Sequence, residues 1–199
     1  MTLKTLIPLI FLATASAASA QETSGEQPAE QSAEQAQAEA EVEAAATNAT
    51  LAMQICLQNY RAPEALLGAF EQAGFAHTTE DFGDGNVLHW FATPDDNLTT
   101  AVAVEGTSVE CRIGTGLWGV EAMLPFAQEA VAALTQGVEV QTGSPEGQNI
   151  LPGTAEAQAD ACSGFHVLLP QTMLWVQILR QGNDGTCISD GTSVMRMIF

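Results

Sequence analysis

The spacing of the hydrophobic residues changes partway along the chain, and this change limits the fold more than any other feature. Two helical patterns come first, at Thr50–Asn59 and Pro63–Gly74, where proline suits a first helical position and glycine suits a helix C-terminus. From Phe75 onward, apolar residues recur at every second position, as they do in half-buried strands. Helices followed by a run of strands predict an α+β fold rather than alternating βαβ units.

The alternating segments predict a single domain with an antiparallel sheet and two or three packed helices. A third helix is expected, with its regular part at Pro125–Gln136, because proline fits the first turn of a helix and kinks a helix interior. A loop rich in glycine, proline and polar residues covers Thr142–Ala161. The expected strands are Phe75–Asp81, Val87–Ala92, Leu98–Val104, Ser108–Ile113, Gly164–Leu169, Met173–Arg180, Thr186–Ser189 and Ser193–Phe199.

A weak internal repeat, called the echo below, occurs in the strand region. Pro94 precedes Cys111 by seventeen positions, and Pro170 precedes Cys187 by the same interval. Each block has the order proline, strand, glycine-containing turn, cysteine-bearing strand. A duplicated β-unit would give this pattern, and so would two ordinary hairpins, so both interpretations stay open.

Four widely spaced cysteines indicate disulfides rather than a metal or redox site. No CxxC pair is present, so neither a zinc site nor a thioredoxin-like site is expected. Of the three pairings that four cysteines allow, we favour the sequential one. Cys56 on a helix would then join Cys111 on a core-facing strand position, and Cys162 would join Cys187.

The first twenty residues have the composition of a secretory signal peptide. Lys4 provides the basic region, an apolar stretch follows, and Ala18-Ser19-Ala20 provides a cleavage site between Ala20 and Gln21. The apolar stretch is too short to span a bilayer, and no cysteine near the cleavage site could carry a lipid anchor. We therefore expect a periplasmic or secreted protein with no membrane span, in a compartment where disulfides persist.

Composition divides the mature chain into two parts. Residues 21–47 are almost entirely Gln, Glu, Ala and Ser, with little to bury, and are expected to form a disordered or transiently helical acidic linker. Residues 48–199, where aromatic residues, glycine and cysteine begin, are expected to form the α+β globular domain.

The charge balance narrows the choice of partner. The net charge is −19, and the mature chain keeps four arginines and no lysine, namely Arg61, Arg112, Arg180 and Arg196. Nucleic acids and anionic lipid surfaces are bound largely through lysine and arginine, so neither is an expected partner. A basic partner or a divalent cation would be attracted, although acidity also serves solubility.

The three histidines are the main candidates for metal chemistry. His77 and His89 could face each other across the Gly83–Asn86 hairpin, but nothing in their spacing forces convergence. No metal ligand and no cofactor is therefore predicted. The nearby carboxylates and the third histidine are Glu80, Asp81, Asp84 and His166.

Signatures of catalysis are weak. The chain contains no GxSxG or SxxK motif, and Asp95 and Asp96 sit side by side in a sequence typical of a solvated turn. The tryptophans could form a carbohydrate platform but are expected in the core, and the glycosylation sequons at Asn48 and Asn97 matter only in a eukaryotic secretory route. The tryptophans are Trp90, Trp118 and Trp175.

These observations favour an exported, non-catalytic interaction module whose partner is a protein of the cell envelope. A small-molecule or metal-binding protein is the alternative. A small hydrolase whose site converges only in three dimensions is less favoured, and an enzyme is not the expected class.

Overall fold

The computed structural model describes residues 27–83, 85–105, 108–136, 140–142, 161–170, 172–179 and 193–199. Three helices and eight strands occupy these ranges, and the predicted α+β class with an antiparallel sheet is confirmed. The predicted signal peptide, the cleavage site at Ala20 and Gln21, and the predicted strand Thr186–Ser189 lie outside the described residues. The helices are α1 (Gln27–Asn59), α2 (Pro63–Gln72) and α3 (Val120–Leu134), and the strands are β1 (Ala76–Asp81), β2 (Val87–Ala92), β3 (Thr99–Glu105), β4 (Ser108–Thr115), β5 (Val140–Thr142), β6 (Ala161–Leu169), β7 (Thr172–Leu179) and β8 (Ser193–Ile198).

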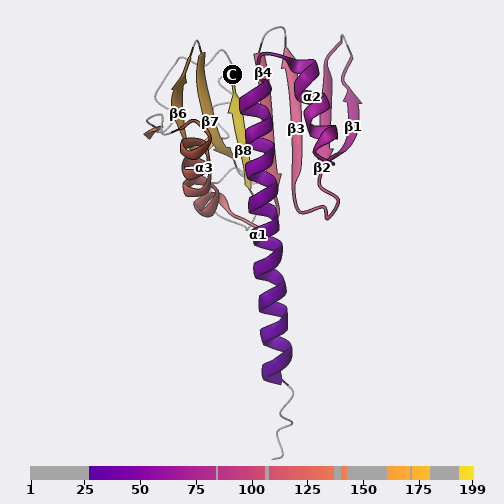
Figure 1. Ribbon diagram of the computed structural model, residues 1–199, viewed down its shortest axis with the longest axis vertical. Coiled ribbons are helices and arrows are strands. Elements are labelled where there is room, and N and C mark those ends of the chain that lie inside the picture. Colours follow the sequence, from indigo (N-terminus) through magenta and orange to yellow (C-terminus); the bar gives the residue numbers. More distant parts are fainter. Residues whose placement is uncertain are drawn as a thin grey trace, which may run out of the picture.

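The molecule has two layers, with the helices on one face of the sheet (Figure 1). Helix α1 runs along β4, α2 covers the β1 side, and α3 packs against β6, β7 and β8. Along β4 and β8 the side chains alternate between buried and more exposed positions, as expected when one face of each strand packs against helices. The face turned away from the helices is called the second face below.

The strand order is β1-β2-β3-β4-β8-β7-β6-β5. Two four-strand meanders therefore meet at their last strands, and each meander follows a helix in sequence. This order is the one that duplication of a helix-plus-four-strands unit would give. The echo noted in the sequence falls only partly on it. Its first strands coincide with β3 and β7, which occupy equivalent places in the two halves, whereas Cys187 precedes β8 by six positions and lies outside the described residues.

Helix α1 is much longer than its sequence pattern predicts. It begins at Gln27, whereas the hydrophobic pattern begins at Thr50, and the expected domain boundary at Asn48 falls inside it. Residues 32–43, here named the arm, are exposed, whereas Ala45, Ala49 and Ala52 are fully buried. Alanine has the highest helix propensity of any residue, and Gln37 donates to Glu41 one turn later, so the helix continues without burying a face.

Helix α2 ends at the glycine that the sequence predicts, whereas α3 begins before its proline. At the end of α2, Gly74 adopts φ +89°, and backbone bonds from Gly74 to Glu71 and from Phe75 to Phe70 complete a Schellman motif. Helix α3 begins at Val120, five residues before Pro125, and continues through this proline. The prediction that its regular part starts at Pro125 was therefore wrong, because the fold accepts one missing backbone donor within the helix.

The core lies between the helices and the sheet and includes a disulfide. Cys56 on α1 and Cys111 on β4 are both fully buried and are bonded, with their Cα atoms 6.6 Å apart. The predicted Cys56–Cys111 pair is confirmed. Cys162 lies in β6, but Cys187 is outside the described residues, so the second pair stays a prediction. The largest fully buried side chains are Phe70, Phe91, Phe165, Met53, Leu66, Leu98, Ile113, Met123, Leu174, Ile178, Met195 and Met197.

Candidate functional site

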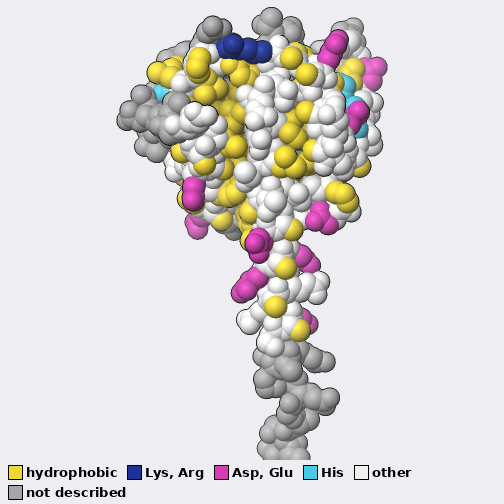
Figure 2. Space-filling view, viewed as in Figure 1, with side chains coloured by type: hydrophobic (Ala, Val, Ile, Leu, Met, Phe, Trp, Pro, Cys, Tyr) yellow, Lys and Arg dark blue, Asp and Glu magenta, His cyan; other side chains and the backbone are white. Residues whose placement is uncertain are grey.

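The arm projects from the domain as a single helix. Figure 2 shows acidic side chains distributed along it, beyond the contact between α1 and the sheet. Its glutamates are Glu34, Glu39, Glu41 and Glu43, and the sequence has no lysine or arginine between Lys4 and Arg61 to neutralise them. The twelve exposed residues extend about 18 Å at 1.5 Å per residue. Because the other half of α1 is buried and bonded to β4, the arm has a fixed direction at its base.

The described part of the chain contains no helix that is both long and apolar enough to cross a membrane. Disulfides such as Cys56–Cys111 are typical of oxidising compartments.

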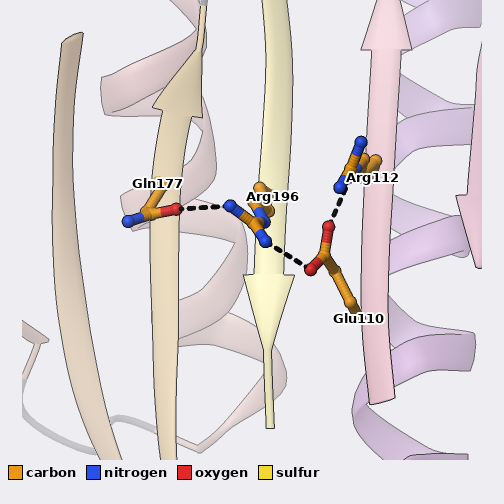
Figure 3. Close-up of polar contacts among 4 residues, drawn as sticks. All are labelled: Glu110, Arg112, Gln177 and Arg196. Atoms are coloured by element: carbon orange, nitrogen blue, oxygen red, sulfur yellow. Dashed lines mark hydrogen bonds and ion pairs between the residues drawn. The ribbon is translucent and has the colours of Figure 1, made fainter. Parts of the chain in front are cut away.

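A network of charged side chains occupies the centre of the second face (Figure 3). Arg112 on β4 and Arg196 on β8 are direct cross-strand partners, a placement that is unfavourable for two like charges. Glu110 resolves it by accepting a hydrogen bond from each arginine: Nε of Arg112 donates to Oε1, and a terminal nitrogen of Arg196 donates to Oε2 at 2.5 Å. A second terminal nitrogen of Arg196 donates to Oε1 of Gln177, which is fully buried.

The network changes the titration of Glu110. Burial by itself would raise the pKa of this carboxyl, but hydrogen bonds and the positive charges of Arg196 and then Arg112 outweigh burial and leave the pKa below its ordinary value. Glu110 is therefore ionised at neutral pH and holds the two guanidinium groups apart. Glu110 and Arg112 alternate with buried residues of β4 and so share one face, but Arg196 could be placed beside them only once the sheet order was known.

The structure brings two of the three histidines into contact. Nε2 of His77 on β1 lies 3.1 Å from Nδ1 of His89 on β2, and Nδ1 of His77 lies 2.7 Å from Oε1 of Glu71 on α2. A carboxylate only accepts, so Nδ1 of His77 donates to Glu71, and in the neutral imidazole Nε2 then accepts from Nδ1 of His89. Burial and the neighbouring His77 both lower the pKa of His89.

The carboxylate of this cluster differs from those that the sequence suggested. Glu80 points to the second face, where it accepts a bond from Nε1 of Trp90, and Asp81 caps the hairpin by accepting from the backbone of Gly83. Asp84 lies outside the described residues. Glu71 could not be chosen in advance, because it depends on how α2 packs against β1. Across the described residues, no group of three or more His, Cys, Asp or Glu is arranged to hold a metal ion.

The other residues that the sequence suggested make contacts typical of residues that stabilise a fold. His166 on β6 packs beside Trp175, at 5.2 Å between ring centroids. Trp118 and Trp175 are buried as predicted, whereas Trp90 is half-buried on the second face. Asp95 accepts from Asn97 within the β2–β3 turn, and Asn97 in turn accepts from Asn48 on α1 at 3.2 Å. The two sequon asparagines therefore bind each other.

A pocket of about 460 Å³ lies where α1 and α3 end. Its lining is mostly apolar, with Arg61 at the rim, where the guanidinium lies over the ring of Tyr60 and donates to the backbone oxygen of Pro170 at 2.6 Å. Tyr60 also stacks on Phe199, with ring centroids 4.7 Å apart. These contacts join the end of α1 to the β6–β7 turn and to the C-terminal residue.

Comparison of the chain with protein-family models, with curated proteins and with solved structures finds no match to any of them.

Proposed function

We propose that the chain is an exported, non-catalytic interaction module that contacts a basic protein of the cell envelope through its arm. The observation that carries this proposal is the continuity of α1. One helix is exposed over residues 32–43, and its following turns are buried and joined to β4 by a disulfide. A partner bound to the arm is therefore rigidly coupled to the domain. A helix that only linked two bodies flexibly would not need this anchoring.

Charge supports a basic partner. The arm carries four glutamates and lies in a chain of net charge −19, so its field attracts cationic surfaces and repels acidic ones. Contacts of this kind lie at the surface, and salt therefore weakens them. Export is supported by the signal-like residues 1–20 and by the disulfide.

The test places a photo-activated cross-linking residue at Ala38 in the middle of the arm. In the native host, the chain should give a discrete adduct with one envelope protein. The adduct should be lost when Glu34, Glu39, Glu41 and Glu43 are all changed to Gln, which removes the charge and keeps the helix. Raising the salt to about 0.5 M before illumination should reduce the adduct in the same way.

A matched control rearranges neutral side chains on the same surface. The double variant Gln35→Ala with Ala40→Gln keeps the arm's composition and charge and should give the adduct unchanged. An adduct that persists in the quadruple Gln variant would contradict recognition by charge. Export is tested separately, by intact mass: the exported chain should begin at Gln21, and an unprocessed chain confined to the cytoplasm would overturn the assignment.

A further inference from the structure

We propose that His77 and His89 form a binding site for a divalent copper ion, with Glu71 orienting the first of the two ligands. This site lies on the α2 side of the sheet and is independent of the arm. Two imidazole nitrogens would bind the metal, and the other coordination positions would be open to water or to a donor from another molecule.

The separation of the two nitrogens suits one shared ion. Nε2 of His77 and Nδ1 of His89 are 3.1 Å apart. With metal–nitrogen bonds of about 2.0–2.1 Å, this separation corresponds to a nitrogen–metal–nitrogen angle of roughly 95–102°. That angle lies between the right angle of tetragonal copper and a tetrahedral angle, and copper binds nitrogen ligands most strongly among the divalent first-row metals.

Glu71 provides the support that metal-binding histidines normally have. Histidines that bind metals usually donate their second ring N–H to a carboxylate or carbonyl, which fixes the tautomer and directs the other nitrogen toward the ion. Nδ1 of His77 is 2.7 Å from Oε1 of Glu71, so the lone pair of its Nε2 points at His89. His77 therefore has the tautomer that binding needs.

Packing holds the His77 ring in place before any ion arrives. The ring stacks on Phe91 with centroids 4.5 Å apart and planes 16° apart, and Phe91 stacks on the buried Phe70 at 4.6 Å. The His77 side chain is 22% exposed, so the site can be reached from solvent. Fixed orientation reduces the entropy lost on binding.

Binding changes one tautomer and one hydrogen bond. In the free protein, the proton on Nδ1 of His89 lies between the two rings. When copper binds, Nδ1 gives this proton up, Nε2 of His89 takes a proton from solvent, and the ion takes the place of the shared proton. An ion at the angle given above lies roughly 40° off the line between the two nitrogens, so both rings must turn for their lone pairs to meet on it.

The experiment titrates copper(II) into the purified chain without an affinity tag. The pH is about 7.5, because unperturbed imidazoles are mostly neutral there. Calorimetry should give one equivalent bound, and electron paramagnetic resonance should show two imidazole nitrogens. Paramagnetic broadening in NMR spectra should remove the ring signals of His77 and His89 but not those of His166.

Variants separate ligands from bystanders. His89→Gln and His77→Phe should each weaken binding at least tenfold, and phenylalanine keeps the stack on Phe91 so that the fold is preserved. His166→Gln is the matched control and should bind as the unaltered chain does. Glu71→Gln should weaken binding by about tenfold or more without removing it.

Retention of full affinity by His89→Gln or His77→Phe would overturn the proposal, and so would a spectrum showing only oxygen ligands. Circular dichroism of each variant confirms that the comparison is made between folded proteins. The arm variants serve as a further check, because the quadruple Gln variant should bind copper unchanged whether or not the arm recognises a partner.

Discussion

At the scale of single residues, the clearest feature is one carboxylate between two arginines that face each other across β4 and β8. Glu110 is 17% exposed and Arg196 14%, whereas Arg112 is 48% exposed. The two ion pairs therefore differ in how far water screens them. A half-exposed pair contributes little to stability, whereas breaking a mostly buried one leaves a charge without its partner.

Removing this carboxylate is expected to destabilise the fold. Glu110→Gln should lower the free energy of unfolding by about 1.5–3 kcal/mol at neutral pH, because two charge-assisted hydrogen bonds are weakened and Arg196 stays mostly buried. Urea unfolding measures the difference. Arg112→Gln is the matched control, expected to cost less than about 1 kcal/mol. Equal losses in the two variants would contradict this ranking.

The same residue predicts a dependence on acid pH. Because the pKa of Glu110 is lowered in the folded protein, the unfolded chain binds its proton first as pH falls. The stabilisation is complete above the unfolded pKa of about 4.3 and is lost as the pH falls through the folded value. The stability gap between the unaltered chain and Glu110→Gln should therefore narrow below about pH 4. A gap that is constant from pH 7 to pH 3 would count against this account.

At the scale of helices and strands, the sequence predicted those elements whose residues carry a local signal. The hairpin around Gly83 and Gly85, the glycine stop of α2 and the alternation of β4 all depend on neighbours in sequence, and each was confirmed. The early start of α1 was missed, because a helix that buries nothing has no hydrophobic pattern to detect. The three-residue strand β5 was missed as well, since its pairing with β6 depends on tertiary contact.

Sites depend even more on contacts between distant segments. His77 and His89 were chosen as candidates for their residue type and for the hairpin that joins their strands. Glu71 and Arg196 come from elements whose packing the sequence pattern does not reveal. Prediction therefore reached the histidines of the cluster, but neither the carboxylate that orients them nor the charged network.

The disulfide between α1 and β4 joins the two layers. It closes a sequence separation of 55 residues, and the chain-entropy model gives about 4 kcal/mol for a loop of that length. Changing both Cys56 and Cys111 to Ala should lower the melting temperature by on the order of 10 °C. Thermal unfolding followed by circular dichroism checks this.

Reduction of the unaltered chain should lower its melting temperature at least as far, since it removes every disulfide. An unchanged melting curve in both experiments would show that packing alone holds α1 against the sheet.

At the scale of the whole molecule, the arm and the domain should differ in local stability. Residues 32–43 are exposed, so opening this part of α1 exposes little apolar surface, whereas the turns from Ala45 onward are buried. A protease that cuts after glutamate should therefore cleave first in the arm. The resistant fragment that remains should begin at Ala44 or a few residues before it.

Mass spectrometry identifies this fragment, and its melting temperature should lie within about 2 °C of that of the intact chain, because no buried contact is lost. Early cleavage after Glu71 or Glu110 would contradict this division between arm and domain. These two glutamates are suitable markers because they lie within the folded part, on α2 and β4.

The strand order also has a consequence for how the chain acquires its structure. The last strand, β8, lies in the middle of the sheet and pairs with β4 on one side and β7 on the other. During synthesis from the N-terminus, the first meander can form early, but its edge at β4 stays open until the final residues emerge. Contacts between segments this far apart in sequence form slowly. Completion of the sheet is thus postponed until β8 has been synthesised, and until then the first meander has an open edge at β4.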